Sequence, residues 1–498
     1  MIRLGQHLLA LLAGLLMALG FAPYAWWWAP LLSLAVIFAL VAKTQRAGGV
    51  FSLGYSYGLG YAGLGVYWIY YSIANYGGGP IAAIAATTVL VALFALIPTV
   101  ALWLGWLVGR RHRPAQALLA LALAWVLVEW VRSWLFTGAT WLSVGYSQID
   151  TPIASFAPVF GVYGLGLILV LIAGGLAACL LKPLSLRWAV PVVMAATALL
   201  AGVLLDRDWT TPTGQPLSAA LIQGNIDQAR KWDPNERTAI FAQYTQQTRD
   251  ALGADLIVWP ESALPMVYQN AQRPITQLAA EAARAGSTLM LGAPAADPAG
   301  AGLFNAVVVP GQSTAFYYKR HLVPFGEYVP FRDWAGAVLN FVGTPLGDFN
   351  AGTSAAPLQA AGHAVGVSIC YEITIGAEIV AALPAAELLL NVSNDAWFGD
   401  SPAPWQHLRM ARMRALELGR PLLRATNTGA SAIIDTRGQL HAQTQLFATT
   451  TLTGEVQPHQ GLTPYARWRD WPVVAVASVG LLALMLTGRR GYRLFRDV

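Results

Sequence analysis

The sequence has few cysteines and few charged residues, and the shortage of charge is local. Only Cys179 and Cys370 are present among 498 residues, which excludes a framework of several disulfide bonds. Charged residues make up 11% of the chain, whereas average soluble domains contain roughly a quarter. No Lys, Arg, Asp or Glu occurs between residues 47 and 109. Such a run cannot form an ordinary soluble surface, and it predicts helices embedded in a membrane.

Eight apolar stretches are each near the roughly 20 residues that cross the hydrocarbon core of a bilayer. They cover residues 5–22, 27–42, 50–73, 80–108, 114–136, 160–181, 188–205 and 472–488. Lys and Arg gather in the connections on one side only, around residues 43–46, 110–113 and 182–187, and in the tail after residue 488. This asymmetry predicts that both termini are cytoplasmic and that residues 206–470 lie on the opposite, extracytoplasmic side of the membrane. A cleaved signal peptide in the first stretch is the alternative, although another apolar stretch follows almost at once.

The predicted domains follow from this division. Residues 1–205 form a membrane domain of seven spans, residues 206–470 a catalytic domain, and residues 471–498 the eighth span with a basic tail. The net charge of +6 comes from the basic membrane rim, because residues 206–470 contain more acidic than basic side chains. A basic rim suits anionic membrane lipid, so no nucleic-acid partner is expected.

Residues 206–470 alternate short β-rich runs with amphipathic helical patterns, which predicts an α/β domain around a central sheet. The expected strands are 219–222, 256–259, 289–292, 306–309, 315–318, 365–369, 388–392 and 432–434. The expected helices are 236–252, 275–285, 376–382 and 405–418. The runs 256–259, 365–369 and 388–392 are apolar throughout, which is typical of inner strands covered on both faces.

Three polar residues end strand-like runs in this domain: Glu261, Lys319 and Cys370. Acyl transfer through a thioester needs a thiol that can lose its proton, a positive group near the developing oxyanion, and an acid that protonates the leaving group. A thiol, an ammonium and a carboxylate can supply these parts. Taken singly, each residue also has a structural explanation, as a packed core thiol, an edge charge or a cap.

The histidines of this domain give no alternative chemistry. They are His321, His363, His407, His441 and His459, and they show no metal-ligand spacing. We therefore expect no metal and no cofactor.

The motifs around the three residues identify a family. They read Val-Trp-Pro-Glu-Ser-Ala at 258–263, Tyr-Lys-Arg-His-Leu-Val-Pro-Phe-Gly-Glu-Tyr-Val-Pro at 318–330 and Ser-Ile-Cys-Tyr-Glu at 368–372. The chain resembles the carbon–nitrogen hydrolase (nitrilase) superfamily, and its apolar stretches make it similar to the membrane-embedded apolipoprotein N-acyltransferase branch. The resemblance implies a polytopic helical membrane bundle joined to an α-β-β-α sandwich.

The resemblance also implies roles for individual residues. Cys370 is the nucleophile, Glu261 the general acid and base, and Lys319 the oxyanion stabiliser. Supporting roles fall to Glu327, Tyr371 and Glu372. The expected substrate-binding residues are Trp232, Leu322, Phe325, Asn391 and Trp397, with 322–326 as an apolar lid over the acyl chains.

The implied reaction has two steps and two lipid-anchored substrates. Cys370 takes an acyl chain from a phospholipid, typically phosphatidylethanolamine, in the bacterial inner membrane. The amine of a diacylglyceryl-modified N-terminal cysteine on a lipoprotein then accepts it. Two alternatives stay open from the residues alone: a membrane-anchored amidase for a small amide, and a non-catalytic membrane scaffold or transporter.

Overall fold

The computed structural model describes residues 4–76, 79–181, 189–300, 302–324, 326–328 and 349–488. The chain forms two compact units. The first, here called the helical unit, comprises Met1–Ile69, Ile84–Arg207 and Arg467–Val498. The second, the α/β unit, comprises Tyr70–Ala83 and Asp208–Ala466. The domain boundaries after residues 205 and 470 stay a prediction, and the division adds residues 70–83 to the α/β unit.

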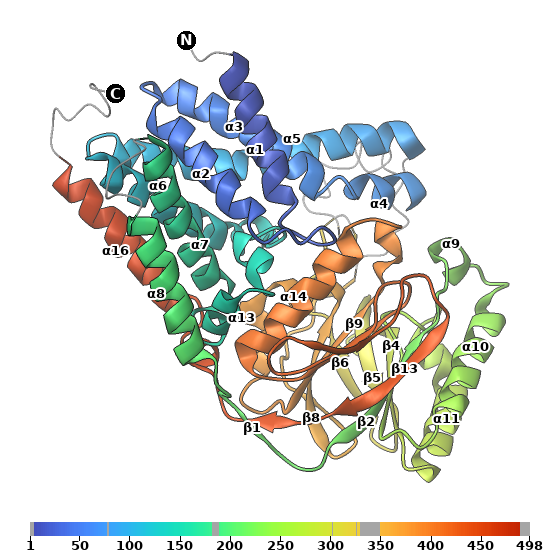
Figure 1. Cartoon of the computed structure of the whole chain (residues 1–498). Helices are drawn as coiled ribbons and strands as arrows, with labels where there is room; N and C mark the ends of the chain where they lie inside the picture. The colour runs from blue at the N-terminus through green and yellow to red at the C-terminus, as the bar shows by residue number, and fades with distance from the viewer. Residues whose placement is uncertain are drawn as a thin grey trace. The chain divides into compact units, whose positions relative to one another are not determined.

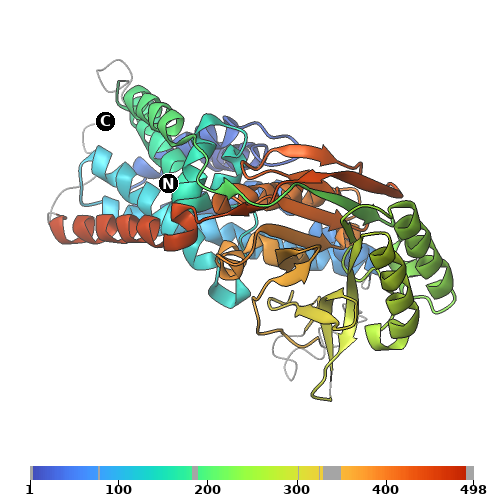
Figure 2. The same ribbon diagram turned by 90° about the horizontal axis from the view of Figure 1, so that it is seen from below.

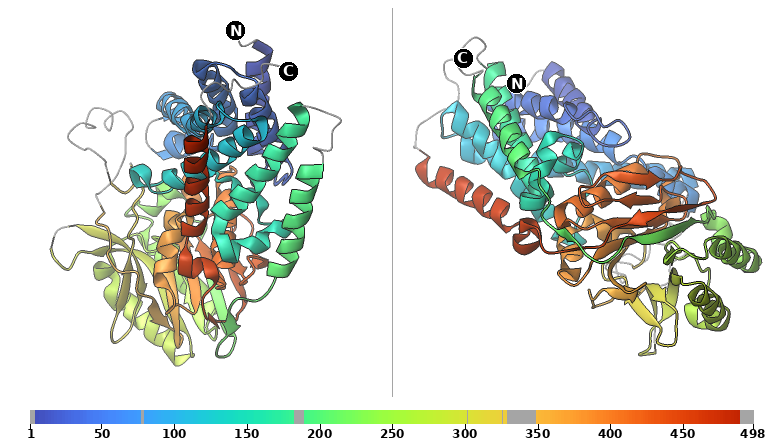
Figure 3. Two further views of the ribbon diagram at one scale, coloured as in Figure 1. Left: turned by 90° about the vertical axis from the view of Figure 1, so that its left-hand side faces the viewer. Right: turned by 60° about the horizontal axis from the view of Figure 1, so that its bottom comes forward.

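Each of the eight apolar stretches contains a helix (Figures 1 and 3). These helices are α1 (Leu4–Ala18), α2 (Ala29–Ala42), α3 (Ala47–Gly65), α5 (Gly79–Gly109), α6 (Pro114–Arg132), α7 (Ala157–Leu181), α8 (Ala189–Leu205) and α16 (Trp471–Thr487), with short 3-10 turns at Leu135–Thr137, Val144–Gln148 and Pro152–Phe156. Within the described residues, three segments are long and apolar enough to cross a membrane: Gly79–Gly109, Pro114–Arg132 and Pro152–Leu181. The other apolar helices are shorter or less apolar, so the structure supports a helical region with three long apolar helices.

The third predicted span, residues 50–73, is not a single helix. Helix α3 ends at Gly65, where Val66 leaves helical geometry with φ −130° and ψ 16°. A separate helix, α4 (Ile69–Tyr76), follows. Ser72 on α4 donates a hydrogen bond from Oγ to the carbonyl oxygen of Trp397 at 2.8 Å, which ties α4 to the α/β unit. The prediction was wrong because the apolar character continues through the break.

Helices α1 and α3 pack closely through glycine. A Cβ on Gly14 of α1 would lie 2.0 Å from the carbonyl oxygen of Tyr57 on α3. A Cβ on Gly60 of α3 would lie 2.2 Å from the carbonyl oxygen of Leu11 on α1. Small residues at helix contacts are characteristic of packing in membranes, where backbones approach without a hydrophobic driving force.

The α/β unit contains two six-stranded sheets and a small two-stranded one. The first sheet has the order β13 (Thr450–Val456), β2 (Leu217–Gln223), β3 (Leu256–Val258), β4 (Thr288–Ala296), β5 (Leu303–Val309) and β6 (Ala315–Tyr318). The second has the order β12 (Leu440–Gln443), β11 (Ala432–Ile434), β10 (Leu422–Thr426), β9 (Leu388–Ser393), β8 (His363–Ile369) and β7 (Leu358–Ala360). The third pairs β1 (Thr211–Pro212) with β14 (His459–Gln460). The inner strands β2–β3–β4 and β8–β9–β10 pair in parallel.

The two large sheets face each other, and helices cover their outer faces. Strand residues alternate between the layers: Leu221 and Val367 lie in the core between the sheets, whereas Ile222 packs against the outer helices. Helices α10 (Arg237–Asp250) and α11 (Gln272–Arg284) cover the first sheet, as Figures 1 and 2 show. Helix α14 (Ala403–Leu418) covers the second. The unit is therefore an α-β-β-α sandwich, as the family resemblance implied.

The eight predicted strands and the predicted helices 236–252, 275–285 and 405–418 are confirmed, with shifts at their ends, whereas 376–382 is a short helix followed by a 3-10 turn. Strands β1, β7, β10, β12, β13 and β14 were not predicted. The remaining short elements are α9 (Gln228–Lys231), α13 (Gly376–Ile379) and α15 (Pro464–Trp468), with 3-10 turns at Tyr268–Ala271, Cys370–Thr374 (η6), Val380–Ala382 and Asp395–Phe398.

Candidate active site

Cys370 lies where the chain leaves β8 and opens η6. Its backbone φ is +52°. Residues with a Cβ seldom adopt this left-handed region, and such outliers cluster at active sites. The side chain is partly buried at the edge of the core between the sheets. This turn makes Cys370 a candidate nucleophile on structural grounds.

Lys319 follows β6 and is 1% exposed. Its Nζ lies 2.8 Å from Oε2 of Glu327 and 3.7 Å from Oε1 of Glu261. Burial alone would lower the pKa of the ammonium, but the charges of Glu327 and Glu261 more than offset it, so the pKa of Lys319 is raised. Lys319 is therefore a permanent positive charge.

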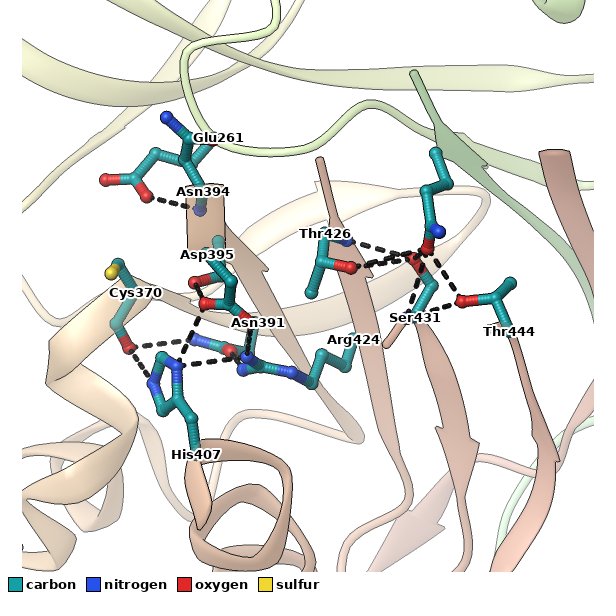
Figure 4. Close-up of polar contacts among 12 residues, drawn as sticks. Glu261, Cys370, Asn391, Asn394, Asp395, His407, Arg424, Thr426, Ser431 and Thr444 are labelled. Atoms are coloured by element: carbon teal, nitrogen blue, oxygen red, sulfur yellow. Dashed lines mark hydrogen bonds and ion pairs between the residues drawn. The ribbon is translucent and has the colours of Figure 1, made fainter. Parts of the chain in front are cut away.

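Glu261 follows β3 and is buried. Its Oε1 accepts a hydrogen bond from Nδ2 of Asn305 at 2.8 Å, and its Oε2 accepts one from the backbone N–H of Asn394 at 2.7 Å (Figure 4). Nδ2 of Asn305 also donates to Oε1 of Glu327 at 2.8 Å. One amide on β5 thus links the two carboxylates that flank Lys319. The arrangement leaves Glu261 little freedom to move away from the lysine.

The same charges act on the thiol of Cys370. Burial and the charge of Glu261 raise the pKa of Cys370, whereas Lys319 lowers it. The thiol is therefore protonated at neutral pH, and the carboxylate of Glu261 influences its ionisation more than that of Asp395. The three residues come from two different sheets, since β3 and β6 belong to one and β8 to the other. Together they can remove a proton, attack a carbonyl carbon and stabilise an oxyanion.

These opposite influences predict opposite changes in thiol reactivity. Glu261→Gln removes a charge that raises the pKa of Cys370, so the thiol should react faster with iodoacetamide than in the wild type. Lys319→Met removes a charge that lowers it, so alkylation should be slower. The rates are measured between pH 7 and pH 10 in a Cys179→Ala background, which leaves a single thiol. Shifts of both variants in the same direction would contradict the electrostatic arrangement.

Glu372 braces the turn that carries Cys370. Its Oε2 accepts hydrogen bonds from the backbone N–H of Ile369 at 2.7 Å and from the hydroxyl of Tyr317 at 3.0 Å. Its Oε1 accepts from the backbone N–H groups of Arg320 at 2.7 Å and His321 at 3.1 Å. Of these hydrogen-bond donors, Ile369 directly precedes Cys370 in the chain, and Arg320 directly follows Lys319. Glu372 therefore fixes the spacing between these two elements.

A second buried network holds the backbone of Cys370 (Figure 4). His407 Nε2 lies 3.1 Å from the carbonyl oxygen of Cys370, and Asn391 Nδ2 lies 3.4 Å from it. Arg424 donates to the side-chain oxygens of Asn391 and Asp395, the latter at 2.8 Å.

The protonation state of His407 follows from its partners. A carbonyl oxygen can only accept, so Nε2 donates to Cys370. Burial and the charge of Arg424 lower the pKa of His407, so the ring is neutral. Its Nδ1 then accepts from Nη2 of Arg424 at 3.0 Å and lies 3.1 Å from Oδ1 of Asp395. The Cys370 carbonyl and the Arg424 guanidinium together fix this tautomer.

Comparison with known proteins identifies the family. The apolipoprotein N-acyltransferase N-terminal domain matches residues 13–175, and the carbon–nitrogen hydrolase domain matches residues 218–463. An apolipoprotein N-acyltransferase of Methylococcus capsulatus is 43% identical over 488 residues, covering 97% of this chain and 96% of the relative. One of Pseudomonas syringae pv. tomato is 42% identical and covers 94% of each chain. The chain belongs to the apolipoprotein N-acyltransferase family.

A solved structure of a carbon–nitrogen hydrolase superfamily protein from Xanthomonas campestris is also similar. It has 17% sequence identity and a TM-score of 0.37, and the match covers 56% of this chain and 98% of that one. The sequence identification with the superfamily and its membrane-embedded branch is confirmed by the family match.

In this apolipoprotein N-acyltransferase family member, Lys319 contacts both Glu261 and Glu327. Glu372 accepts a hydrogen bond from Ile369, the residue before Cys370. Tyr371 follows Cys370, and its ring centroid lies 5.9 Å from that of His321.

The expected substrate-binding residues lie in several places. Asn391 is buried on β9 against the Cys370 turn. Trp232 directly follows α9 and is 43% exposed, whereas Trp397 and Leu322 are partly buried. Phe325 lies outside the described residues. The substrate contacts of these residues stay predictions.

Sequence reasoning missed several residues that surround the site. They are Lys231, Asn305, His407 and Arg424. Asn394 and Asp395, by contrast, lie inside the segment 391–399, which the family resemblance implies to be a loop that lines the pocket. The four missed residues gave no such signal, because burial of a lone Lys, Asn, His or Arg cannot be read from its neighbours along the chain.

Proposed function

We propose that this protein transfers an acyl chain from a phospholipid, through a thioester on Cys370, to the N-terminal amine of a diacylglyceryl-cysteine lipoprotein. The observation that carries the proposal is the convergence of Cys370, Lys319 and Glu261 in the α/β unit of an apolipoprotein N-acyltransferase family member. The apolar helices fit substrates that stay in a bilayer, since each buried CH₂ of an acyl chain resists extraction by about 0.8 kcal/mol.

In the first step, Glu261 accepts the proton of the Cys370 thiol as sulfur bonds to the ester carbonyl carbon of the phospholipid. The carbonyl oxygen becomes an oxyanion, which the Lys319 ammonium stabilises. The ester C–O bond then breaks, and Glu261 returns the proton to the departing glyceryl oxygen. The products are an acyl-thioester on Cys370 and a lysophospholipid.

In the second step, the α-amine of the lipoprotein cysteine attacks the thioester carbon. Glu261 takes a proton from the amine as the new C–N bond forms, and the C–S bond breaks. The proton passes to sulfur, which restores the Cys370 thiol. The second substrate thus enters after the first product has left, as in other covalent two-step transfers.

The supporting residues have positioning roles in this proposal. Glu327 and Asn305 hold Lys319 and Glu261 at their mutual distances. Glu372 and the His407 network hold the Cys370 turn. Trp232, Leu322, Phe325 and Trp397 are proposed to contact the acyl chains, with phosphatidylethanolamine as the typical donor.

We further propose the finer membrane arrangement. All eight apolar helices span the bacterial inner membrane, both termini are cytoplasmic and the α/β unit is periplasmic. The Lys and Arg asymmetry of the connections supports this orientation. Cysteine accessibility to an impermeant maleimide, introduced at residue 45 or residue 215, tests it in intact cells. Labelling at residue 45 without permeabilisation would contradict the orientation.

The proposed reaction is tested by intact-mass spectrometry of the purified protein after incubation with a defined phospholipid. We expect one acyl adduct that hydroxylamine removes, that persists in Cys179→Ala and that is absent from Cys370→Ala. Adding a diacylated lipopeptide should discharge the adduct with formation of an amide. Acylation of Cys370 by small amides with release of ammonia, followed by discharge of the adduct to water, would instead favour the amidase alternative.

A further inference from the structure

Lys231 is a buried charge that the proposed reaction does not use. It ends α9, it is fully buried, and its Nζ has no hydrogen-bond partner within the described part of the chain. An ammonium buried without a partner costs several kcal/mol or loses its proton. Proteins keep such a group where a ligand or a reaction compensates that cost.

The position of Lys231 is fixed relative to Glu261. Gln228 lies one helical turn before Lys231, so the two side chains share a face of α9. Oε1 of Gln228 accepts from Nδ2 of Asn394 at 2.8 Å, and the backbone N–H of Asn394 donates to Glu261 at 2.7 Å. Asn427 also holds Asn394 in place, because Nδ2 of Asn427 donates to Oδ1 of Asn394 at 2.9 Å.

The carboxylate of Glu261 does not neutralise this ammonium by direct contact. Its oxygens already accept from Asn305 and Asn394, and Lys319 lies 3.7 Å from it. Burial lowers the pKa of Lys231 to about 8, and the charge of Glu261 opposes this shift. Lys231 is therefore still mainly protonated at neutral pH, and its charge is close to the acid–base carboxylate without being paired to it.

We propose that Lys231 forms a binding subsite for the phosphodiester of the acyl donor. The inference rests on the proposed function. The glyceryl oxygen that Glu261 protonates and the phosphodiester belong to the same glycerol unit, so the phosphodiester must come close to Glu261. Lys231 supplies an unpaired cation there. The diacylglyceryl-cysteine acceptor has no phosphodiester, so Lys231 acts on the first step only.

The test compares two donors with identical acyl chains, phosphatidylethanolamine and diacylglycerol, in single-turnover thioester formation. Lys231→Met should lower the rate with the phospholipid by about 10- to 100-fold, the range expected for loss of one charge-assisted hydrogen bond. It should change the rate with diacylglycerol by less than about twofold, since that donor lacks the phosphate. Lys231→Arg, which keeps the charge, should retain part of the preference for phospholipid.

Arg230→Met is the matched control. Arg230 precedes Lys231, and its side chain is 58% exposed and paired with Glu236 at 2.6 Å. Its replacement should leave both rates unchanged. Lys231→Met should also fold as well as the wild type, because a methionine removes an unpaired buried charge.

Any other outcome of this experiment would overturn the inference, and each outcome would do so for a different reason. Equal losses with both donors would mean that Lys231 acts through Glu261, and no loss would mean that it binds no donor. Binding of inorganic phosphate without competition against phospholipid would assign the subsite to free phosphate. Failure of the wild type to form any thioester would refute the proposed function itself, whereas normal thioester formation by Lys231→Met would refute only this subsite.

Discussion

Lys319→Met should abolish thioester formation on Cys370. Loss of one preplaced oxyanion donor lowers rates by about 10²–10³-fold. The loss here should be larger, because Glu261 and Glu327 would share Asn305 without the cation between them. Without the cation the two carboxylates would repel each other, so Glu261 would no longer be held where it can accept the thiol proton. Intact-mass measurement of adduct formation after phospholipid addition records the loss.

The same substitution should also destabilise the α/β unit, and a second change separates the two effects. Removing one partner of a buried ion pair typically costs about 3–5 kcal/mol. Adding Glu327→Gln to Lys319→Met removes one of the stranded carboxylates, so stability should recover in large part while activity does not. Lys319→Arg keeps the positive charge but moves the hydrogen-bond donors. This variant should therefore fold, but it should form the thioester poorly. Near-normal thioester formation by Lys319→Met would remove Lys319 from the mechanism.

The three candidate residues could be found in the sequence because each follows a recognisable strand. Glu261 and Cys370 come directly after apolar runs that form β3 and β8, and Lys319 ends the aromatic run of β6. An apolar strand followed by a polar residue can be recognised from neighbouring residues in the sequence. The resemblance of the surrounding motifs then indicated that these strand ends belong to one site.

The central strand β10 could not be predicted for a physical reason. Its residues Leu422–Thr426 include Arg424, which is fully buried. A charged residue in a short apolar run normally indicates a solvent-exposed face. Arg424 is inside because Asp395 and Asn391, from the preceding strand and its loop, satisfy its guanidinium. That compensation is a tertiary contact, which single-sequence patterns do not record.

The break between α3 and α4 was hidden for the opposite reason. Residues 47–76 contain no charged residue, so composition changes little where the helix ends at Gly65. Hydropathy predicts that a segment is apolar, not that its helix is continuous. The contact between Ser72 and the carbonyl oxygen of Trp397 places α4 against the 3-10 turn Asp395–Phe398, a placement that depends on residues more than 300 positions away.

Arg424→Met should be the most destabilising single substitution in the network behind Cys370. Arg424 and Asp395 are both fully buried, with Nη2 and Oδ2 2.8 Å apart. Removing the guanidinium strands the Asp395 carboxylate, at an expected cost of about 3–5 kcal/mol. His407 would lose the donor that fixes its tautomer and with it part of its hold on the Cys370 carbonyl. Denaturant unfolding followed by tryptophan fluorescence measures the free energy of unfolding.

The pH dependence of that loss identifies its cause. Burial alone would raise the pKa of Asp395, but the charge of Arg424 offsets burial and holds the pKa well below the unfolded value of 3.8. In the wild type this carboxylate therefore contributes stability above about pH 4, which is lost as the pH falls toward the folded pKa. In Arg424→Met burial prevails and raises that pKa, so the carboxylate destabilises the fold at neutral pH and ceases to do so once protonated. The stability difference between the two proteins should be largest at neutral pH and shrink as the pH falls below about 5.

Two variants complete this experiment. Arg437→Met removes an exposed ion pair, in which Nη2 lies 3.1 Å from Oδ1 of Asp208, and should change stability by less than about 1 kcal/mol. Asp395→Asn combined with Arg424→Met removes the stranded charge, so it should recover much of the lost stability without restoring the rate of thioester formation. If the single Arg424→Met variant were as stable as Arg437→Met at pH 7, the buried pair would not support the Cys370 turn. A loss that is independent of pH would assign the effect to packing of the arginine side chain, because an apolar contact does not titrate.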